Sequence, residues 1–336
     1  MTLVLSVLPC LAAAAISFAL LLWLKPLLAR YALAKPSTRS SHKTSTPQGG
    51  GIAVIAATAI VVAALDFFVL LPIDATLRLA VVFALTLGLA LVGATDDVRP
   101  LEAAPRLALQ IAAVAAVIAT LPDELRILPI FPWWLDRGFM LLGGVWLVNV
   151  VNFMDGIDWM TVAEIVPVTA AIGLFGFMGA LPLGASLVAL ALCGAMVGFA
   201  PFNRPVAQLF LGDVGSLPIG LLLGWFLVLL AGGGHLAAAV LLPLYYLADA
   251  TLTLIRRLIR GEAITQPHRS HFYQRALDNG FSVEQIVGLV FAANIVLVGL
   301  ATLTFLAESS MLQVAIIMAG AALVGLLLWF FARKNR

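Results

Sequence analysis

Long stretches of the chain carry no charged side chain, and this constrains the fold more than any other feature. The uncharged runs Leu3–Leu24, Gly49–Leu65 and Val214–Gly234 approach or reach the roughly 20 residues that cross a bilayer as a helix. Of the 336 residues, 62% are hydrophobic and 11% are charged, whereas soluble domains carry about 25% charged residues. The sequence therefore predicts an all-α polytopic integral membrane protein.

The apolar runs predict about eleven transmembrane helices in a single domain over residues 1–336. We expect them near 3–24, 50–71, 76–94, 103–121, 138–153, 160–179, 183–200, 214–231, 236–259, 283–306 and 311–332. With this count, sixteen of the nineteen Lys and Arg residues fall on one side of the membrane. Basic residues gather in cytoplasmic connections, so the N-terminus is expected outside and the C-terminus in the cytoplasm.

Five polar stretches interrupt the apolar sequence, and the expected topology places all of them on the cytoplasmic face. They are KPSTRSSHKTSTPQGGG (35–51), TDDVRP (95–100), NFMDGID (152–158), FNRPVAQLFLGDVGS (202–216) and RRLIRGEAITQPHRSHFYQR (256–275). Acids, bases and histidines that are distant in sequence are therefore expected to meet on one membrane face. The two cysteines, Cys10 and Cys193, lie in apolar runs and indicate neither a disulfide nor a metal site.

The residue types in these stretches suit phosphate chemistry. Mg²⁺ prefers oxygen ligands, usually one or two carboxylates completed by substrate phosphates and water. Clustered carboxylates repel one another unless a cation lies between them. The candidate carboxylates are Asp96, Asp97, Asp155, Asp158 and Asp213, and the candidate phosphate-binding arginines are Arg204, Arg256, Arg257 and Arg260. Asp213 stands between glycines just before an apolar helix, where backbone N–H groups can approach an anion.

Taken together and in this order, the stretches resemble the polyprenyl-phosphate N-acetylhexosamine-1-phosphate transferase superfamily, glycosyltransferase family 4. The similarity covers Lys35 to about Ser282. PSTRSSHKTSTPQGGG, NFMDGID and HRSHFYQRA look most like members that start O-antigen, lipopolysaccharide or related cell-envelope glycans. The peptidoglycan branch, with phospho-MurNAc-pentapeptide translocase, is more distant.

The resemblance implies a reaction in which undecaprenyl phosphate attacks the β-phosphorus of a UDP-N-acetylhexosamine with Mg²⁺ or Mn²⁺ as cofactor. The products are UMP and a polyprenyl-diphospho-sugar. It further implies a bacterial inner (plasma) membrane protein whose active site faces the cytoplasm, and loops 25–49, 95–102, 152–159, 201–213 and 260–282 that form that site. No nucleic-acid partner is expected. Some family members form dimers, and whether this chain forms a homodimer stays open.

The family's site residues carry over at matching positions only. Asp213 and Asn152 are implied as metal ligands, and Asp96 and Asp97, with His268 and His271, are implied as catalytic residues. Asn152, Asp155 and Asp158 are implied to line the nucleotide pocket with Lys43 close by, and the loop of His268 and His271 shapes the sugar-phosphate site. Arg204 and Arg256 complete the expected substrate-binding set.

Three positions depart from the family pattern. The peptidoglycan branch has a lysine at the third position after its Asp pair, where this chain has Pro100, so no cation is expected there. Trp159 replaces a glycine common after DGID and is expected to reshape the uridine pocket. The histidines of PHRSHF are not contiguous, which leaves the match of His268 and His271 to family histidines open.

Structural readings of the same residues stay open. Asp96 and Asp97 suit a helix end and Asp213 a helix N-cap. NFMDGID and TPQGGG are also typical of turns, and the histidines are also typical of a solvent-exposed loop. The arginines are expected at a cytoplasmic helix end from membrane topology alone, without a binding role. Asp249 suits either a bond within the bundle or a functional role. A secondary transporter or lipid-carrier flippase is the alternative function, although transporters place coupling residues near the midplane and often show repeats, which are not seen here.

Overall fold

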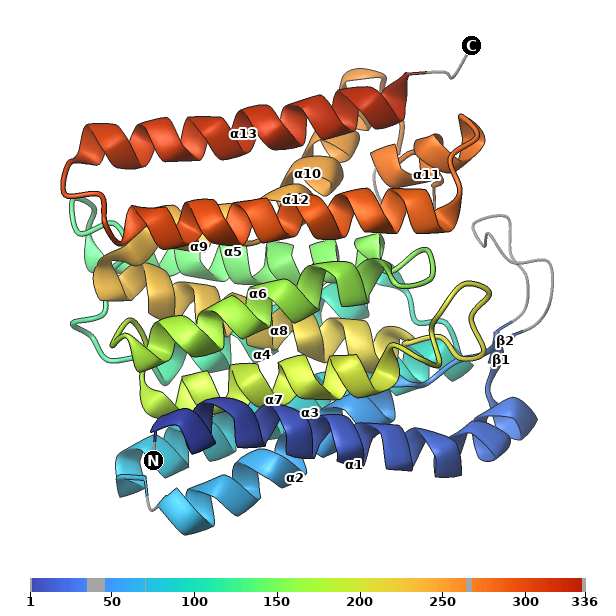
Figure 1. The fold of residues 1–336 in the computed structure, drawn as a ribbon, viewed down its shortest axis with the longest axis horizontal. Coiled ribbons are helices and arrows are strands. Elements are labelled where there is room, and N and C mark those ends of the chain that lie inside the picture. Colours follow the sequence, from blue (N-terminus) through green and yellow to red (C-terminus); the bar gives the residue numbers. More distant parts are fainter. Residues whose placement is uncertain (1, 35–45, 70, 264–267, 334–336) are drawn as a thin grey trace.

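A computed structural model of the chain describes residues 2–34, 46–69, 71–263 and 268–333. It is a helical bundle with one minimal two-stranded sheet (Figure 1). The first half comprises α1 (Thr2–Tyr31), β1 (Leu33–Ala34), β2 (Thr46–Pro47), α2 (Gly51–Val69), α3 (Ile73–Val98), α4 (Ala103–Ala119), α5 (Trp133–Met154) and α6 (Met160–Phe177). The second half comprises α7 (Leu183–Phe199), α8 (Asp213–Leu230), the π-helical turn η1 (Ala231–His235), α9 (Leu236–Leu241), α10 (Leu244–Ile259), α11 (Phe272–Asp278), α12 (Val283–Thr304) and α13 (Ser310–Ala332).

Helix length and composition confirm a polytopic membrane protein. Among the described residues, eight helical stretches are long and apolar enough to cross a membrane, and α4 and α7 are shorter apolar helices. Each of the eleven predicted segments coincides with one of these stretches or with the pair α9 and α10. The chain is therefore built from membrane-spanning helices, as the uncharged runs predicted.

Helix α8 is the centre of the bundle. It is apolar all round and buried along nearly its whole length, as expected of a helix that is enclosed by others. It packs against α2, α3 and α5. By contrast, α1 and α13 lie at opposite edges of the bundle and expose large apolar side chains such as Trp23 and Met311 (Figure 1). Such surfaces suit contact with lipid.

Several helix limits differ from the predicted ones. Helix α1 continues through Lys25 and Arg30 to Tyr31, and α5 begins at Trp133 instead of 138. The expected span 236–259 is broken, because Pro243 lacks the N–H that a continuous helix needs. A turn with Gly234 at φ +91° separates it from α8. The short helix α11 lies in a stretch that was expected to be a loop.

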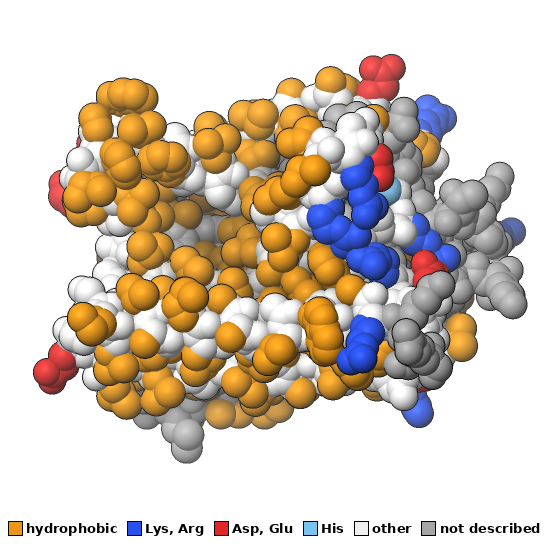
Figure 2. Space-filling view, turned by 90° about the horizontal axis from the view of Figure 1, so that it is seen from above, with side chains coloured by type: hydrophobic (Ala, Val, Ile, Leu, Met, Phe, Trp, Pro, Cys, Tyr) orange, Lys and Arg blue, Asp and Glu red, His pale blue; other side chains and the backbone are white. Residues whose placement is uncertain are grey.

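The connections with the polar motifs lie together at one end of the bundle (Figure 1). They are the strands β1 and β2, the α3–α4, α5–α6 and α7–α8 connections, and the region of α11. The small sheet pairs Leu33 with Pro47 and Ala34 with Thr46 in antiparallel register. This end is also where Lys and Arg side chains gather on the face shown in Figure 2, while the remainder of that face is mostly hydrophobic.

Candidate active site

The N-terminus of α8 is capped by a side chain from another helix. Asp97, in the last turn of α3, accepts hydrogen bonds from the backbone N–H groups of Asp213 (2.9 Å) and Val214 (3.1 Å), one at each carboxylate oxygen. The first N–H groups of a helix have no partner within the helix, and the helix dipole favours an anion there. Asp97 therefore fixes the start of α8, and with it the position of the Asp213 side chain.

The glycines on either side of Asp213 are required by close approach. A Cβ at Gly93 of α3 would lie 2.1 Å from the carbonyl oxygen of Asp213, and one at Gly212 would lie 2.6 Å from Asp97 Oδ2. Gly212 also has φ +78°, which favours glycine. On the other side, a Cβ at Gly51 would lie 2.2 Å from the Cα of Gly215. The glycines thus let α2 and α3 reach the beginning of α8.

The end of the first polar stretch is bound to the segment before Asp213. Phe210 donates its N–H to the carbonyl of Pro47 (2.8 Å), and Gly50 donates to the carbonyl of Phe210 (2.9 Å). The side-chain amide of Gln48 donates to the backbone carbonyl of Asp97 (2.7 Å). The stretch TPQGGG therefore holds the start of α2 against the segment before Asp213. Lys43, predicted near the nucleotide, lies outside the described residues.

Asp213 and Asp96 face a common position. The Asn152 side-chain amide donates to Asp213 Oδ1 (2.7 Å) and to the Ser216 hydroxyl (2.9 Å). Asp96 Oδ1 accepts from the N–H of Leu101 (2.6 Å). The remaining oxygens, Asp96 Oδ2 and Asp213 Oδ2, lie 2.7 Å and 3.7 Å from the same atom, Nη1 of Arg106. The structure thus brings four sequence-predicted residues together, namely Asp96, Asp97, Asn152 and Asp213.

Arg106 lies at the candidate site, although the sequence did not single it out. Pro100 had suggested that the third position after the Asp pair supplies no cation. The α3–α4 connection instead returns the chain so that Arg106, in the first turn of α4, reaches Asp96. A cation in the first turn opposes the helix dipole, and this placement was the available signal that an acid lies nearby.

NFMDGID joins the site to the connection between α7 and α8. Asp155 accepts a hydrogen bond from the Thr161 hydroxyl (2.5 Å). Burial, together with the negative charges of Asp97 and Asp158, raises the pKa of Asp155 well above its ordinary value, to about 7, although the Thr161 bond lowers it. Asp158 is buried and accepts from the N–H of Ala207 (2.9 Å). Asp155 therefore lies within the electrostatic field of the Asp97 site, and Asp158 holds the α7–α8 connection.

Trp159 adopts the left-handed backbone conformation, with φ +62°. This conformation is unfavourable for a large side chain and explains why glycine suits the position. Its N–H donates to Asn203 Oδ1 (2.8 Å), and its indole N–H donates to the carbonyl of Ala200 (2.6 Å). Trp159 therefore anchors the end of α7 and the following turn.

The histidine loop is held by a fully buried carboxylate. Asp249 of α10 accepts from the N–H groups of Phe272 (2.9 Å) and Tyr273 (3.1 Å), and its Oδ1 lies 3.2 Å from His271 Nδ1. His271 is buried, and His268 stacks on it with ring centroids 4.9 Å apart. Asp249 thus both caps α11 and orients His271, so it bonds within the bundle and positions a predicted site residue.

Tyr273 connects this loop to NFMDGID. Its hydroxyl donates to the carbonyl of Phe153 (3.2 Å), and a Cβ at Gly156 would lie only 2.0 Å from the same hydroxyl. The two motifs, more than a hundred residues apart, therefore pack directly against each other. Gly156 is required by this contact and not by turn geometry alone.

The predicted arginines occupy different surroundings. Arg256 is half-buried, with its guanidinium 5.1 Å from the centre of the Phe272 ring. Arg257 pairs with Glu262 (2.9 Å) and so holds the chain beyond α10. Arg204 is exposed, and among the described residues it forms no ion pair with the site carboxylates. The structure therefore brings neither Arg204 nor Arg257 to the carboxylates.

The donor set around Asp213 fits a hard divalent cation that is completed by a substrate. In the described part of the chain, no three His, Cys, Asp or Glu side chains form a ready-made metal cluster. Mg²⁺ needs only one or two protein carboxylates when phosphates supply further oxygens. Asp96 Oδ2 and Asp213 Oδ2 already converge on one cationic nitrogen, so this position suits positive charge.

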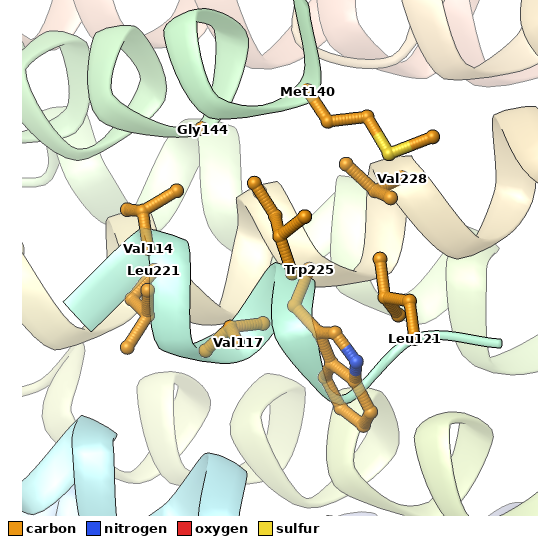
Figure 3. A pocket seen from close by; sticks show the side chains of 10 residues that line it. Val114, Val117, Leu121, Met140, Gly144, Leu221, Trp225 and Val228 are labelled. Carbon is orange, nitrogen blue, oxygen red and sulfur yellow. The ribbon is translucent and has the colours of Figure 1, made fainter. Parts of the chain in front are cut away.

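An apolar pocket lies deeper in the bundle between α4, α5 and α8 (Figure 3). Its lining includes Val114, Met140, Gly144, Leu221 and Trp225. Leu221 and Trp225 follow Asp213 along α8 by two to three turns, which is roughly 12–18 Å. The pocket offers no carboxylate or basic side chain, so it is not the place of the polar chemistry.

These features define a polytopic membrane protein with a carboxylate-lined polar site at one end of its helical bundle. The sequence model of glycosyl transferase family 4 matches residues 79–231, which include the Asp pair, NFMDGID and the α8 motif. Over these residues the chain is similar to glycosyl transferase family 4, and the curated proteins that it resembles are named as polyprenyl-phosphate N-acetylglucosamine-1-phosphate transferases.

Curated relatives agree with this similarity. A probable undecaprenyl-phosphate N-acetylglucosaminyl 1-phosphate transferase of Bacillus subtilis is 24% identical, over 81% of this chain and 78% of its own length. Decaprenyl-phosphate N-acetylglucosaminephosphotransferase of Mycolicibacterium smegmatis is 28% identical, over 90% of this chain and 82% of its own length. Undecaprenyl-phosphate alpha-N-acetylglucosaminyl 1-phosphate transferase of Salmonella typhi is 28% identical, over 79% of this chain and 74% of its own length.

Proposed function

We propose that the protein transfers an N-acetylhexosamine-1-phosphate from a UDP-sugar to undecaprenyl phosphate, as the first membrane step of a cell-envelope glycan. A phosphate oxygen of the lipid forms a bond to the β-phosphorus of the nucleotide sugar. The bond from that phosphorus to the bridging oxygen breaks, and UMP leaves. The observation that carries the proposal is the meeting of Asp96, Asp97 and Asp213 from α3 and α8 at one end of the bundle.

The chain's own residues supply positioning and charge, which account for most of the catalysis in phosphoryl transfer. Asn152 fixes the Asp213 carboxylate through Oδ1, and Asp97 fixes the helix that carries it. Asp96 and Asp213 would hold the cofactor. When bound there, Mg²⁺ would offset the negative charge of the diphosphate. Of the Asp pair, Asp96 is better placed to orient the lipid phosphate, because both oxygens of Asp97 accept backbone hydrogen bonds that fix α8, whereas Asp96 Oδ2 accepts from the Arg106 side chain.

The remaining predicted residues surround this centre. We propose that Asp155, Asp158 and Lys43 shape the nucleotide pocket and that His268, His271 and Arg256 shape the sugar-phosphate site. The buried Asp249 then acts as a positioning residue for His271. GlcNAc is the sugar in the names of the relatives from Bacillus and Salmonella, and we propose it as the first donor to examine.

We also propose that the polar end faces the cytoplasm of a bacterial inner membrane, with about eleven crossings. The support is the gathering of Lys and Arg at this end (Figure 2), together with the positive-inside rule. An interfacial site has a physical advantage, because the lipid phosphate stays at the surface while its tail remains in hydrocarbon.

The test is release of UMP by the full chain in nanodiscs with undecaprenyl phosphate and a panel of UDP-N-acetylhexosamines. We expect release that depends on Mg²⁺ and is abolished in Asp213→Asn. The matched control is Asp74→Asn, an exposed acid at the opposite end of α3, which should release UMP as the wild type does. No UMP release with any donor would refute the proposal and favour a transporter.

A further inference from the structure

We propose that Arg106 is a built-in counter-cation that occupies the place of the divalent metal and is displaced when the metal binds. This inference rests on the metal dependence of the proposed function. Arg106 Nη1 lies 2.7 Å from Asp96 Oδ2 and 3.7 Å from Asp213 Oδ2. A single nitrogen thus stands between two carboxylates from different helices.

The hydrogen-bond pattern leaves few carboxylate oxygens for a metal. Both oxygens of Asp97 accept N–H groups of α8, and Asp213 Oδ1 accepts from Asn152. Asp96 Oδ1 accepts from the backbone of Leu101. Each of these four oxygens is held by an uncharged donor that also shapes the local fold. What remains is Asp96 Oδ2, which accepts from Arg106, and Asp213 Oδ2, which lies 3.7 Å from the same nitrogen; the Asp96 and Asp213 side chains also contact each other directly through a hydrogen bond.

A divalent ion held by Asp96 and Asp213 would therefore compete with the guanidinium group of Arg106 for its position. In the protein without metal, Arg106 offsets the repulsion between Asp96 and Asp213. A divalent metal ion carries twice the charge of the guanidinium group and also binds the substrate phosphates, so it displaces Arg106 when it is present.

Arg106 is suited to leave. Its side chain is about one-quarter exposed, so a path to solvent exists. Its place in the first turn of α4 puts a cation near the positive end of a helix dipole, which weakens its hold. Among the described residues, its ion pairs are those with Asp96 and Asp213. Once these carboxylates bind a metal, the helix itself favours release of the side chain.

The first measurement is Mn²⁺ binding to the full chain in nanodiscs, without substrate, by electron paramagnetic resonance. Removal of the competing cation in Arg106→Gln should tighten the Kd for Mn²⁺ about five-fold, the factor expected for a partly exposed ion pair. Arg99→Gln removes an exposed charge of the same sign from the preceding connection and should leave the Kd within about two-fold. An unchanged or weaker Kd in Arg106→Gln would overturn the proposal.

The second measurement detects displacement in the wild type, so it does not depend on a variant that folds. Phenylglyoxal modifies accessible arginines, and peptide mass spectrometry compares Arg106 with Arg99 in the same sample. Saturating Mn²⁺ should speed the modification of Arg106 several-fold relative to Arg99. Equal or slower modification means that Arg106 stays in place and refutes displacement. Mg²⁺-dependent UMP release would stand in that case, so failure here is distinguishable from failure of the transferase proposal.

Discussion

The cap that Asp97 places on α8 gives a prediction that separates folding from chemistry. In Asp97→Ala, the N–H groups of Asp213 and Val214 lose their acceptor, at 2.9 Å and 3.1 Å in the wild type. Hydrogen bonds to a charged group contribute about 1.5–3 kcal/mol each. The free energy of unfolding should therefore fall by about 3–5 kcal/mol in Asp97→Ala.

Asp97→Asn should lie between the wild type and the alanine variant. The amide oxygen still accepts from one N–H group, but its NH₂ faces the other donor. One charge-assisted bond is lost, so we expect a decrease of about 1.5–3 kcal/mol. A variant designed to remove only a catalytic charge would thus also weaken the start of α8.

The assay is unfolding by SDS in bicelles, followed by tryptophan fluorescence, with hydrogen exchange at the N-terminus of α8 as a local readout. Asp74→Asn, in the exposed first turn of the same helix α3, is the control and should change the unfolding free energy by less than about 0.5 kcal/mol. Suppose that Asp97→Ala unfolds like the wild type and its α8 amides exchange at the wild-type rate. Asp97 would then not be the cap, and the reasoning would be refuted.

Two further predictions concern NFMDGID. Gly156→Ala should destabilise the protein by about 1–3 kcal/mol, because its Cβ would lie 2.0 Å from the Tyr273 hydroxyl. The control is Gly143→Ala, which has open space around the position and should not destabilise the protein. Equal midpoints of the two variants in SDS unfolding would contradict this prediction. Asp155 has a pKa raised to about 7 by burial, so the folded state keeps a proton that the unfolded state has lost between about pH 4 and 7. Its contribution to stability should therefore decrease as pH rises through this window, by up to about 4 kcal/mol, and level off above it. The measurement is the unfolding free energy of the wild type minus that of Asp155→Asn at each pH. This difference should decrease with rising pH between about pH 4 and 7, and a difference that does not change with pH would contradict the prediction.

The helices were predictable because a bilayer leaves few alternatives. An uncharged run of about 20 residues can satisfy its backbone only as a helix, so its existence follows from composition. The meeting of the polar stretches followed from counting crossings, since connections separated by an even number of spans share a face. The first and last residues of the helices were less predictable. Helix α1 continues through Lys25 and Arg30, because basic side chains at a membrane surface do not end a helix.

The site details depended on contacts that one stretch of sequence does not contain. Asp97 appeared to be one of two equivalent acids, and only the approach of α3 to α8 at Gly93 makes it a cap. Trp159 was recognised as unusual at a glycine position. Its left-handed backbone conformation was not predicted, and the bond of its indole to Ala200 depends on where α7 ends.

The pairing of Asp213 with glycines follows from the same geometry. A carboxylate at the start of an apolar helix is costly to hold near hydrocarbon, and glycine within a helix weakens it. Here Gly212 and Gly215 allow α2 and α3 to enclose the helix start, so that Asn152 and Arg106 can reach the Asp213 side chain. Larger residues at either glycine would separate these helices, and Asp96 Oδ2 and Asp213 Oδ2 would no longer both lie near Arg106. The glycines are therefore as necessary to the proposed metal position as the acids themselves.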